Sequence, residues 1–180
     1  MAKHQLVIFC DGGARGNPGS AAAAFVVKDG AGNIQGKRGK LFDKLRARPF
    51  DYAPLGKLGA GRARPFDYAQ GKFLGVTTNN VAEYQAVVEA LAWIKGNLTQ
   101  GTDLANLEIR FYLDSSLVVN QLRGKFKVKD RKLRDLLAEV RGRERELGAV
   151  RISYDYVPRE ENSEADRTVN ETLDRVMGRM

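Results

Sequence analysis

Residues 5–29 read QLVIFCDGGARGNPGSAAAAFVVKD, and this stretch decides the fold expected for the chain. Its two apolar runs, residues 5–11 and 21–29, have the length and composition of strands. The Gly- and Pro-rich residues between them are typical of a turn, so the two strands are predicted to form an antiparallel pair. The first strand ends in an acid, Asp11, which is a candidate functional residue.

A second turn signal, DGAGN at residues 29–33, predicts a third strand that runs back beside the second. Residues 34–42 could begin this strand, and residues 71–78 could supply or complete it. Apolar periodicity then predicts helices over residues 80–94, 115–124, 129–146 and 162–177, with strands over residues 107–114 and 149–157. Asn79 or Asn80 is the expected N-cap of the first helix. This order predicts an α/β fold with a mixed sheet.

Four carboxylates occupy positions where an α/β sheet presents a functional site. Asp11 and Asp114 close predicted strands, whereas Glu83 and Asp166 are expected in the first turns of helices. Each also has a purely structural explanation, since acids favour the start of a helix and Asp commonly caps or turns the chain after a strand. Taken singly, these residues leave both explanations open.

The chain resembles the type 1 ribonuclease H family in five stretches that follow the family's order. These are DGGARGNPG (11–19), TTNNVAEYQAVVEAL (77–91), DSSLVVNQL (114–122), GKFKVKD (124–130) and NSEAD (162–166). The resemblance covers nearly the whole chain except roughly residues 38–71. It implies one ribonuclease H-like domain over residues 1–180, with a five-stranded mixed sheet, its first three strands antiparallel, flanked by helices.

The same resemblance identifies Asp11, Glu83, Asp114 and Asp166 as catalytic acids that bind two Mg²⁺ ions, or Mn²⁺ in their place. Such ions prefer hard oxygen ligands, and clustered carboxylates repel one another until cations neutralise them. Two ions about 4 Å apart can hold an attacking water and a leaving 3′-oxygen on either side of one phosphorus. The expected reaction is hydrolysis of the RNA strand of RNA–DNA hybrids, which leaves 5′-phosphate and 3′-hydroxyl ends.

Two other functions stay open at this point. One is an inactive ribonuclease H-like module that binds nucleic acid without cutting it, and the other is a nuclease of the same fold that also acts on double-stranded RNA. The complete set of acids favours an enzyme over a binding module.

The resemblance also implies which residues contact the substrate. Asn79 and Asn80 are expected at base edges in the minor groove, Thr78 in the phosphate pocket of the DNA strand, and the turn from Gly12 to Asn17 near RNA 2′-hydroxyls. Residues 123–134 hold seven Lys and Arg against one Asp, which favours phosphate steering, although a solvated helical face is equally compatible. The full set expected to bind substrate is Gly12, Gly13, Asn17, Thr78, Asn79, Asn80, Ser115, Lys125 and Lys127.

Two positions depart from the family pattern. Many relatives carry a histidine in the loop before the last aspartate, whereas this chain has VPREENSEAD at residues 157–166 and its one histidine is His4. Water or one of Glu160, Glu161 and Glu164 is then expected to manage the protons. Asp130 stands where relatives often have Asn, and its carboxylate would repel a phosphate that an amide would bind.

The phrase RARPFDYA occurs twice, at residues 46–53 and 62–69. The formal charge of the chain is +8, and residues 37–72 hold ten Lys and Arg against three Asp. Residues 38–71 are expected to be a basic insertion at the end of the sheet remote from the acids. It is either a tolerated loop or an arm that binds nucleic acid through its aromatic residues, Phe50, Tyr52, Phe66 and Tyr68.

The short N-terminal apolar run and the single cysteine fit the expectation of a cytoplasmic monomer that does not associate with membranes. The apolar run at residues 6–10 is too short for a signal peptide or a membrane span. Cys10 is the single cysteine, so it cannot form an internal disulfide, and a buried core position is expected for it.

Overall fold

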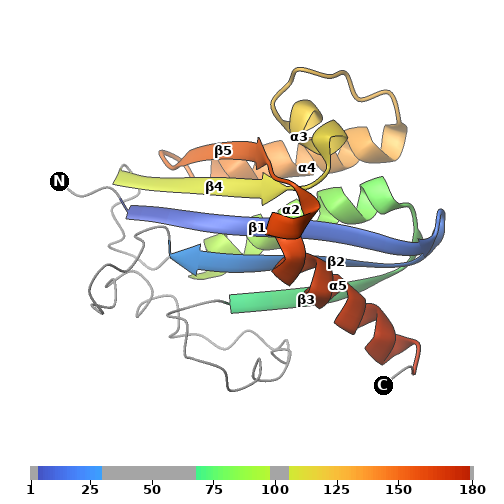
Figure 1. Ribbon diagram of the computed structural model, residues 1–180. Coiled ribbons are helices and arrows are strands. Elements are labelled where there is room, and N and C mark those ends of the chain that lie inside the picture. The colour runs from blue at the N-terminus through green and yellow to red at the C-terminus, as the bar shows by residue number, and fades with distance from the viewer. Residues whose placement is uncertain (1–3, 30–67, 98–105, 179–180) are drawn as a thin grey trace.

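The computed structural model describes residues 4–29, 68–97 and 106–178. Its centre is a five-stranded sheet with the order β3-β2-β1-β4-β5 (Figure 1). β1 pairs antiparallel with β2, and β2 with β3, whereas β4 runs parallel to both β1 and β5. The predicted fold class is therefore confirmed. The strands are β1 His4–Gly16, β2 Gly19–Asp29, β3 Tyr68–Thr77, β4 Leu107–Leu113 and β5 Arg151–Tyr156.

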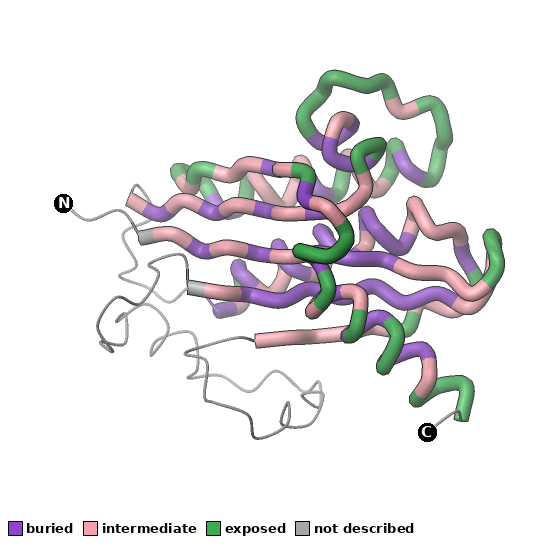
Figure 2. The backbone as a smooth tube through the Cα atoms, viewed as in Figure 1, coloured by how far each residue is buried: buried purple, intermediate pink, exposed green. Residues whose placement is uncertain are grey.

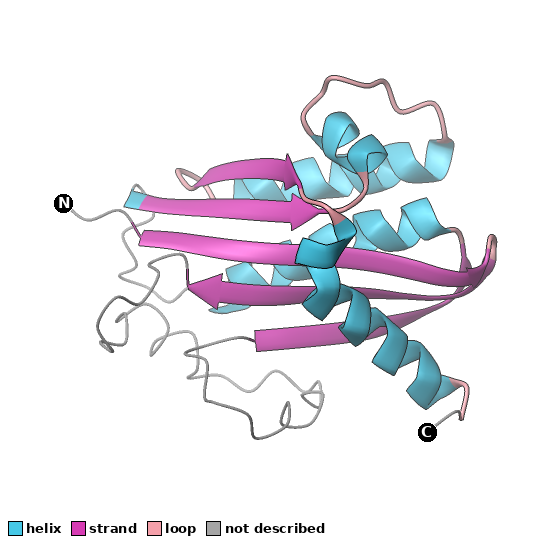
Figure 3. Cartoon of the chain, in the orientation of Figure 1, coloured by secondary structure: helices cyan, strands magenta, loops and turns pink. Residues whose placement is uncertain are grey.

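Helices cover both faces of this sheet (Figure 3). α2 packs against β1 and β2 with α4 beside it, and α5 crosses the opposite face over β1, β2 and β3, in front of the sheet in Figure 1. None of the helices in the described parts of the chain is long and apolar enough to span a membrane. The helices are α2 Asn79–Asn97, α3 Ser116–Leu122, α4 Arg131–Glu146 and α5 Ser163–Val176, with the 3₁₀ helix η2 at Arg159–Asn162.

The alanines of β2 allow helices to approach from both sides. Ala22 and Ala24 form a small cluster with Val169 and Leu173 of α5, whereas Ala23 belongs to the larger core beneath α2. Successive strand residues face opposite sides of a sheet, so small side chains are needed on both faces here. Figure 2 shows the resulting buried stretch along the middle of the sheet. The larger core also contains Cys10, fully buried as predicted.

β1 extends further than the sequence predicts. Residues 12–16 were expected in a turn, but they pair with β2 from Gly12 opposite Ala23 to Gly16 opposite Gly19, so only Asn17 and Pro18 remain at the turn. Gly16 has a φ of 94°, a value that glycine adopts without strain. Glycine lowers strand propensity, but here the pairing with β2 overrides it.

β3 begins inside the second copy of the repeated phrase, three residues earlier than the predicted strand at 71–78. The ring of Tyr68 stacks on Trp93 of α2, with 4.9 Å between the ring centroids, and lies 6.0 Å from that of Phe25. Tyr68 is therefore part of the folded domain. The alternative strand at 34–42, the first copy of the phrase, and Phe50, Tyr52 and Phe66 lie outside the described residues.

Candidate metal centre

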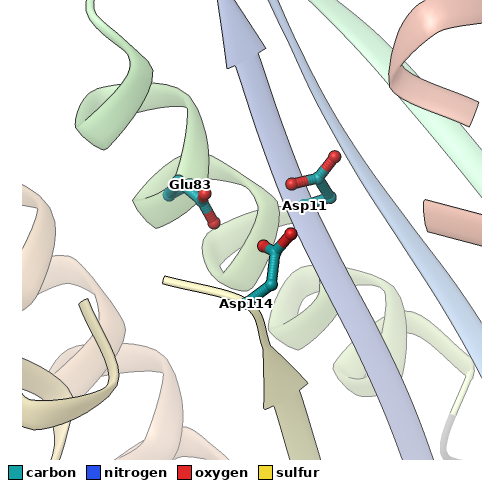
Figure 4. A group of neighbouring side chains, drawn as sticks. All are labelled: Asp11, Glu83 and Asp114. Atoms are coloured by element: carbon teal, nitrogen blue, oxygen red, sulfur yellow. The ribbon is translucent and has the colours of Figure 1, made fainter. Parts of the chain in front are cut away.

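Three acidic side chains converge where β1 and β4 stop pairing. Cys10 and Leu113 form the last pair between these parallel strands, so Asp11 and Asp114 follow it on adjacent chains. Glu83 extends toward both from α2 (Figure 4). One carboxylate oxygen from each of the three lies within 4.8 Å of the others. Glu83 is the fifth residue of α2, directly after the first turn in which the sequence predicts it.

Two glycines allow the helices that carry acids to reach β1. A Cβ added to Gly12 would lie 2.1 Å from the backbone of Ala82 and Glu83, and one added to Gly13 would lie 2.8 Å from Cγ1 of Val169 on α5. The two positions face opposite sides of the strand, so α2 approaches at the first and α5 at the second. The sequence assigned both glycines to substrate contact, and this packing role became evident only from the fold.

Burial and like charge raise the pKa values of the converging acids. Asp11 is only 6% exposed, and burial, followed by the charges of Asp114 and Asp166, raises its pKa to about 7. The pKa of Glu83 is raised well above its ordinary value, first by burial and then by Asp11 and Asp114. Oε2 of Glu83 is buried and has no hydrogen-bond partner among the described residues. Buried, mutually repelling oxygen ligands with an unused acceptor fit a hard divalent cation.

Asp166 lines the same cleft, but other side chains bind its carboxylate. The cleft has a volume of about 470 Å³ and also contains Asp11, Glu83 and Asp114 in its lining. Oδ1 of Asp166 lies 2.5 Å from a guanidinium nitrogen of Arg159, and Nδ2 of Asn170 donates to Oδ2 at 3.1 Å. The fourth predicted acid is therefore beside the three converging oxygens without being one of them.

The sequence did not identify Arg159 as part of the site. It is the first residue of η2, within the histidine-free stretch at residues 157–166, and it lines the cleft together with Tyr156 and Asn170. Of the three glutamates expected to serve there, Glu164 pairs with Lys28 at 2.7 Å, and the other two are exposed residues of η2. The spacing of Arg159 from Asp166, seven residues, carries no periodic signal, because the chain passes from η2 into α5 between them.

Several residues expected to bind substrate also organise the backbone around the cleft. The Thr78 hydroxyl accepts from the N–H of Val81, so Thr78 caps α2, and the prediction of Asn79 or Asn80 as the N-cap is wrong. The backbone N–H of Asn79 instead donates to Oδ1 of Asn17 at 3.2 Å, which joins the β1–β2 turn to α2. Threonine can cap a helix as asparagine does, so the side chains of Asn79 and Asn80 are not needed as the N-cap of α2.

The segment that follows Asp114 shows the same dual use of polar side chains. Ser115 lines the cleft, and its hydroxyl caps α3 by accepting from the N–H of Val118. Oδ1 of Asp130 accepts from the N–H of Leu133 at 2.9 Å, so this carboxylate caps α4. Lys125 and Lys127 are exposed between these two helices.

A second hollow, of about 660 Å³, lies between α4 and β5. Its one glutamate is already engaged: the Tyr154 hydroxyl donates to Glu144 at 2.6 Å, and Arg141 pairs with the same carboxylate at 2.8 Å. Within the parts of the chain that the structure describes, the acids that gather as a possible metal site are therefore those in the cleft around Asp11.

Comparison with known proteins gives consistent matches. Residues 62–172 match the family model described as reverse transcriptase-like. The chain is 30% identical over 170 residues to the Bifunctional protein Rv2228c of Mycobacterium tuberculosis. The aligned residues cover 94% of this chain and 36% of that protein. The chain is 31% identical over 166 residues to Ribonuclease HI of Halobacterium salinarum, covering 92% and 63%. The chain thus spans about a third of the mycobacterial relative's length.

A solved structure extends the similarity to three dimensions. LC11-RNase H1, isolated from compost, matches with a TM-score of 0.70 and 30% identity over 96% of this chain and 98% of that chain. LC11-RNase H1 in complex with an RNA/DNA hybrid matches with a TM-score of 0.69 and 29% identity, covering 96% and 99%.

Proposed function

We propose that this chain, which belongs to the type 1 ribonuclease H family, is a metal-dependent endonuclease that hydrolyses the RNA strand of RNA–DNA hybrids. The observation that carries the proposal is the convergence of Asp11, Glu83 and Asp114 within 4.8 Å in a cleft that Asp166 also lines. The relative named Ribonuclease HI and the hybrid-bound structural relative support the choice of substrate.

The proposed cofactors are two divalent ions, Mg²⁺ or Mn²⁺. Asp11, Glu83, Asp114 and Asp166 would hold them, with the first three already gathered in one place. When bound, such ions activate water for attack on phosphorus and stabilise the leaving 3′-oxygen, which gives a 5′-phosphate and a 3′-hydroxyl. Asp11 and Glu83 are both buried, so electrostatic interactions of their carboxylates are stronger than those at an open surface.

Residues around the acids would orient the hybrid. The side chain of Arg159 is 75% exposed beside Asp166, so its guanidinium can hold that carboxylate and contact a phosphate through its remaining donors. The Thr78 hydroxyl accepts one hydrogen bond and still has its own hydrogen to donate. Asn79 lines the cleft and is tied through its backbone to Asn17. Hydrogen bonds from these asparagines to 2′-hydroxyl groups would distinguish RNA from DNA.

The test is cleavage of an end-labelled RNA–DNA hybrid, with duplex DNA and duplex RNA alongside, in Mg²⁺, in Mn²⁺ and in EDTA. Native chain is compared with Asp114→Asn and with Asp135→Asn, which makes the same chemical change at an exposed position of α4. We expect cleavage of the hybrid's RNA strand alone, in metal only, abolished by Asp114→Asn and retained in the control.

The other outcomes identify the alternatives. Cleavage of duplex RNA as well as the hybrid would indicate the broader nuclease. Binding of the hybrid without cleavage in either metal would overturn the enzymatic proposal in favour of a binding module.

A further inference from the structure

Asn162 is a buried polar residue that joins two acid-bearing segments of the site. It is 0% exposed and stands at the end of η2, directly before α5. Its Nδ2 donates to the backbone carbonyl of Cys10 at 3.0 Å. Cys10 precedes Asp11, and Asp166 follows Asn162 by four residues, about one helical turn. One side chain thus links the backbone next to Asp11 with the helix that carries Asp166.

The hydrogen bond from Asn162 is made where strands β1 and β4 stop pairing. Cys10 is the last residue of β1 that pairs with β4, and the acids Asp11 and Asp114 follow immediately on the two strands. Beyond this point the β1–β4 ladder no longer sets the position of the backbone of β1. The amide of Asn162 supplies a hydrogen bond to Cys10, the residue at which that ladder ends.

The orientation of the amide shows which contact it serves. Asn162 occupies the N-cap position of α5, where a side-chain oxygen commonly accepts a backbone N–H of the first turn. It makes no such bond, and its Oδ1 is buried without a hydrogen-bond partner among the described residues. An asparagine serving only as a helix cap would use that oxygen, so the donor end and its bond to Cys10 account for the amide at this position.

A second contact holds the same helix against β1. The side chain of Val169 packs where Gly13 leaves room, one turn beyond Asp166. Asp166 therefore lies between two anchoring points on β1, the hydrogen bond at Cys10 and the close approach at Gly13.

We propose that Asn162 is a positioning residue that sets the separation of Asp11 and Asp166 and thereby the affinity of the cleft for divalent cations. Its part in the reaction rests on the proposed function, but its effect on cation binding can be measured without substrate. Hydrogen-bonding partners just outside a ligand set commonly change metal affinity by about 10- to 100-fold when they are removed.

The experiment titrates Mn²⁺ into substrate-free protein by calorimetry for the native chain, Asn162→Ala, Asp166→Asn and the double variant. The matched control is Thr172→Ala, which removes another buried side-chain hydrogen bond of α5, from Thr172 to the Thr168 carbonyl at 2.7 Å, further along the helix from the acids. We expect Asn162→Ala to weaken Mn²⁺ binding about tenfold. The same change should have little effect once Asp166 is Asn, and the control should bind like the native chain.

Circular dichroism establishes that each variant is folded at the titration temperature. If Asn162→Ala does not fold, Asn162→Ser, which keeps a shorter donor, replaces it and should show a smaller loss. Native-like Mn²⁺ affinity in the folded variant would overturn the inference, as would a loss that adds in full to that of Asp166→Asn. A native chain that binds Mn²⁺ yet never cuts the hybrid would refute the proposed function alone, and one that binds no Mn²⁺ would refute both.

Discussion

The carboxyl groups of Asp11 and Glu83 are unusual because each is buried next to another acid. Burial and neighbouring negative charge both favour the protonated form, so Asp11 has a pKa of about 7 and that of Glu83 is also raised. A carboxyl group must lose its proton to bind a metal ion. Cation binding by this cleft is therefore coupled to proton release at pH values where most carboxyl groups are already ionised.

The first prediction concerns pH. The folded-state pKa of Asp11 is above its unfolded value, so its contribution to stability is present below the unfolded pKa and is lost as pH rises through about 7. In EDTA, Tm should fall between pH 5 and pH 8 more in the native chain than in Asp11→Asn, and Mn²⁺ affinity should rise over the same range. Thermal melts and calorimetry check both, and identical pH profiles for the two proteins would contradict the assignment.

Arg159 places a cation next to the acids, and the second prediction separates its two effects. Arg159→Gln removes a positive charge beside Asp166, so Mn²⁺ should bind about two- to fivefold more tightly, the range of an exposed ion pair. The hybrid should bind about tenfold more weakly, since a charge-assisted contact to phosphate is lost. Calorimetry and a filter-binding assay measure the two affinities. Arg159→Lys is the control that keeps the charge, and unchanged hybrid affinity in Arg159→Gln would exclude the phosphate contact.

At the level of secondary structure elements, the site depends on how closely α2 and α5 approach β1. The approach on one face is limited by backbone, because Gly12 abuts the main chain of Ala82 and Glu83. On the other face it is limited by the side chain of Val169 opposite Gly13. A side chain can change rotamer, whereas the main chain of a packed helix cannot move without the whole element. The two neighbouring glycines should therefore differ in their tolerance of a methyl group.

The third prediction follows from this difference. Gly12→Ala should lower the free energy of unfolding by about 3 kcal/mol or more and abolish Mn²⁺ binding, because α2 must shift together with Glu83. Gly13→Ala should lower the free energy of unfolding by about 1 kcal/mol, and adding Val169→Ala to this variant should restore part of the lost stability. Urea denaturation measures both, and equal losses in the two single variants would contradict the proposed packing.

Across the whole molecule, the acids lie far along the sheet from Asp29 and Tyr68, the two described residues between which the chain connects β2 to β3. β2 ends at Asp29, opposite Leu6 of β1, and β3 begins at Tyr68, opposite Val27. Asp11 lies five residues along β1 from Leu6, about 17 Å at the usual rise of a strand. Most of the formal charge of +8 comes from residues 37–72, whereas the smaller basic cluster at residues 123–134 follows Asp114 closely in the sequence.

The fourth prediction is that shortening the connection leaves the chemistry intact. Replacing residues 31–66 by a short glycine-containing turn should keep kcat on the hybrid, because Asp29 and Tyr68, the strand ends that the turn would join, are remote from Asp11. A deletion that extends to Gly71 should lower Tm, since it also removes the stacking of Tyr68 on Trp93. Steady-state kinetics and thermal melts of the two deletion variants check these expectations. Loss of kcat in a folded protein that keeps Tyr68 would show that the segment takes part in catalysis, and a shallower salt dependence of binding would show contact with phosphates.

The amino-acid sequence by itself determined the order of strands and helices, the burial of Cys10 and the family, because apolar periodicity and short motifs are local properties. It singled out the acids by the same motifs. Local pattern was insufficient where a tertiary contact competed with it: residues 12–16 read as a turn and form strand, and the asparagines after Thr78 read as a cap that Thr78 itself provides.

Only the tertiary structure decided how the predicted acids are arranged in the cleft and which other groups meet them there. The convergence of Asp11, Glu83 and Asp114, the pairing of Arg159 with Asp166 and the bond from Asn162 to Cys10 join segments that no spacing rule connects, the last across 152 residues. Such contacts depend on where the chain turns back in space and on how closely two elements can pack. Those distances are set by the whole core and by the glycines and alanines that let the helices approach.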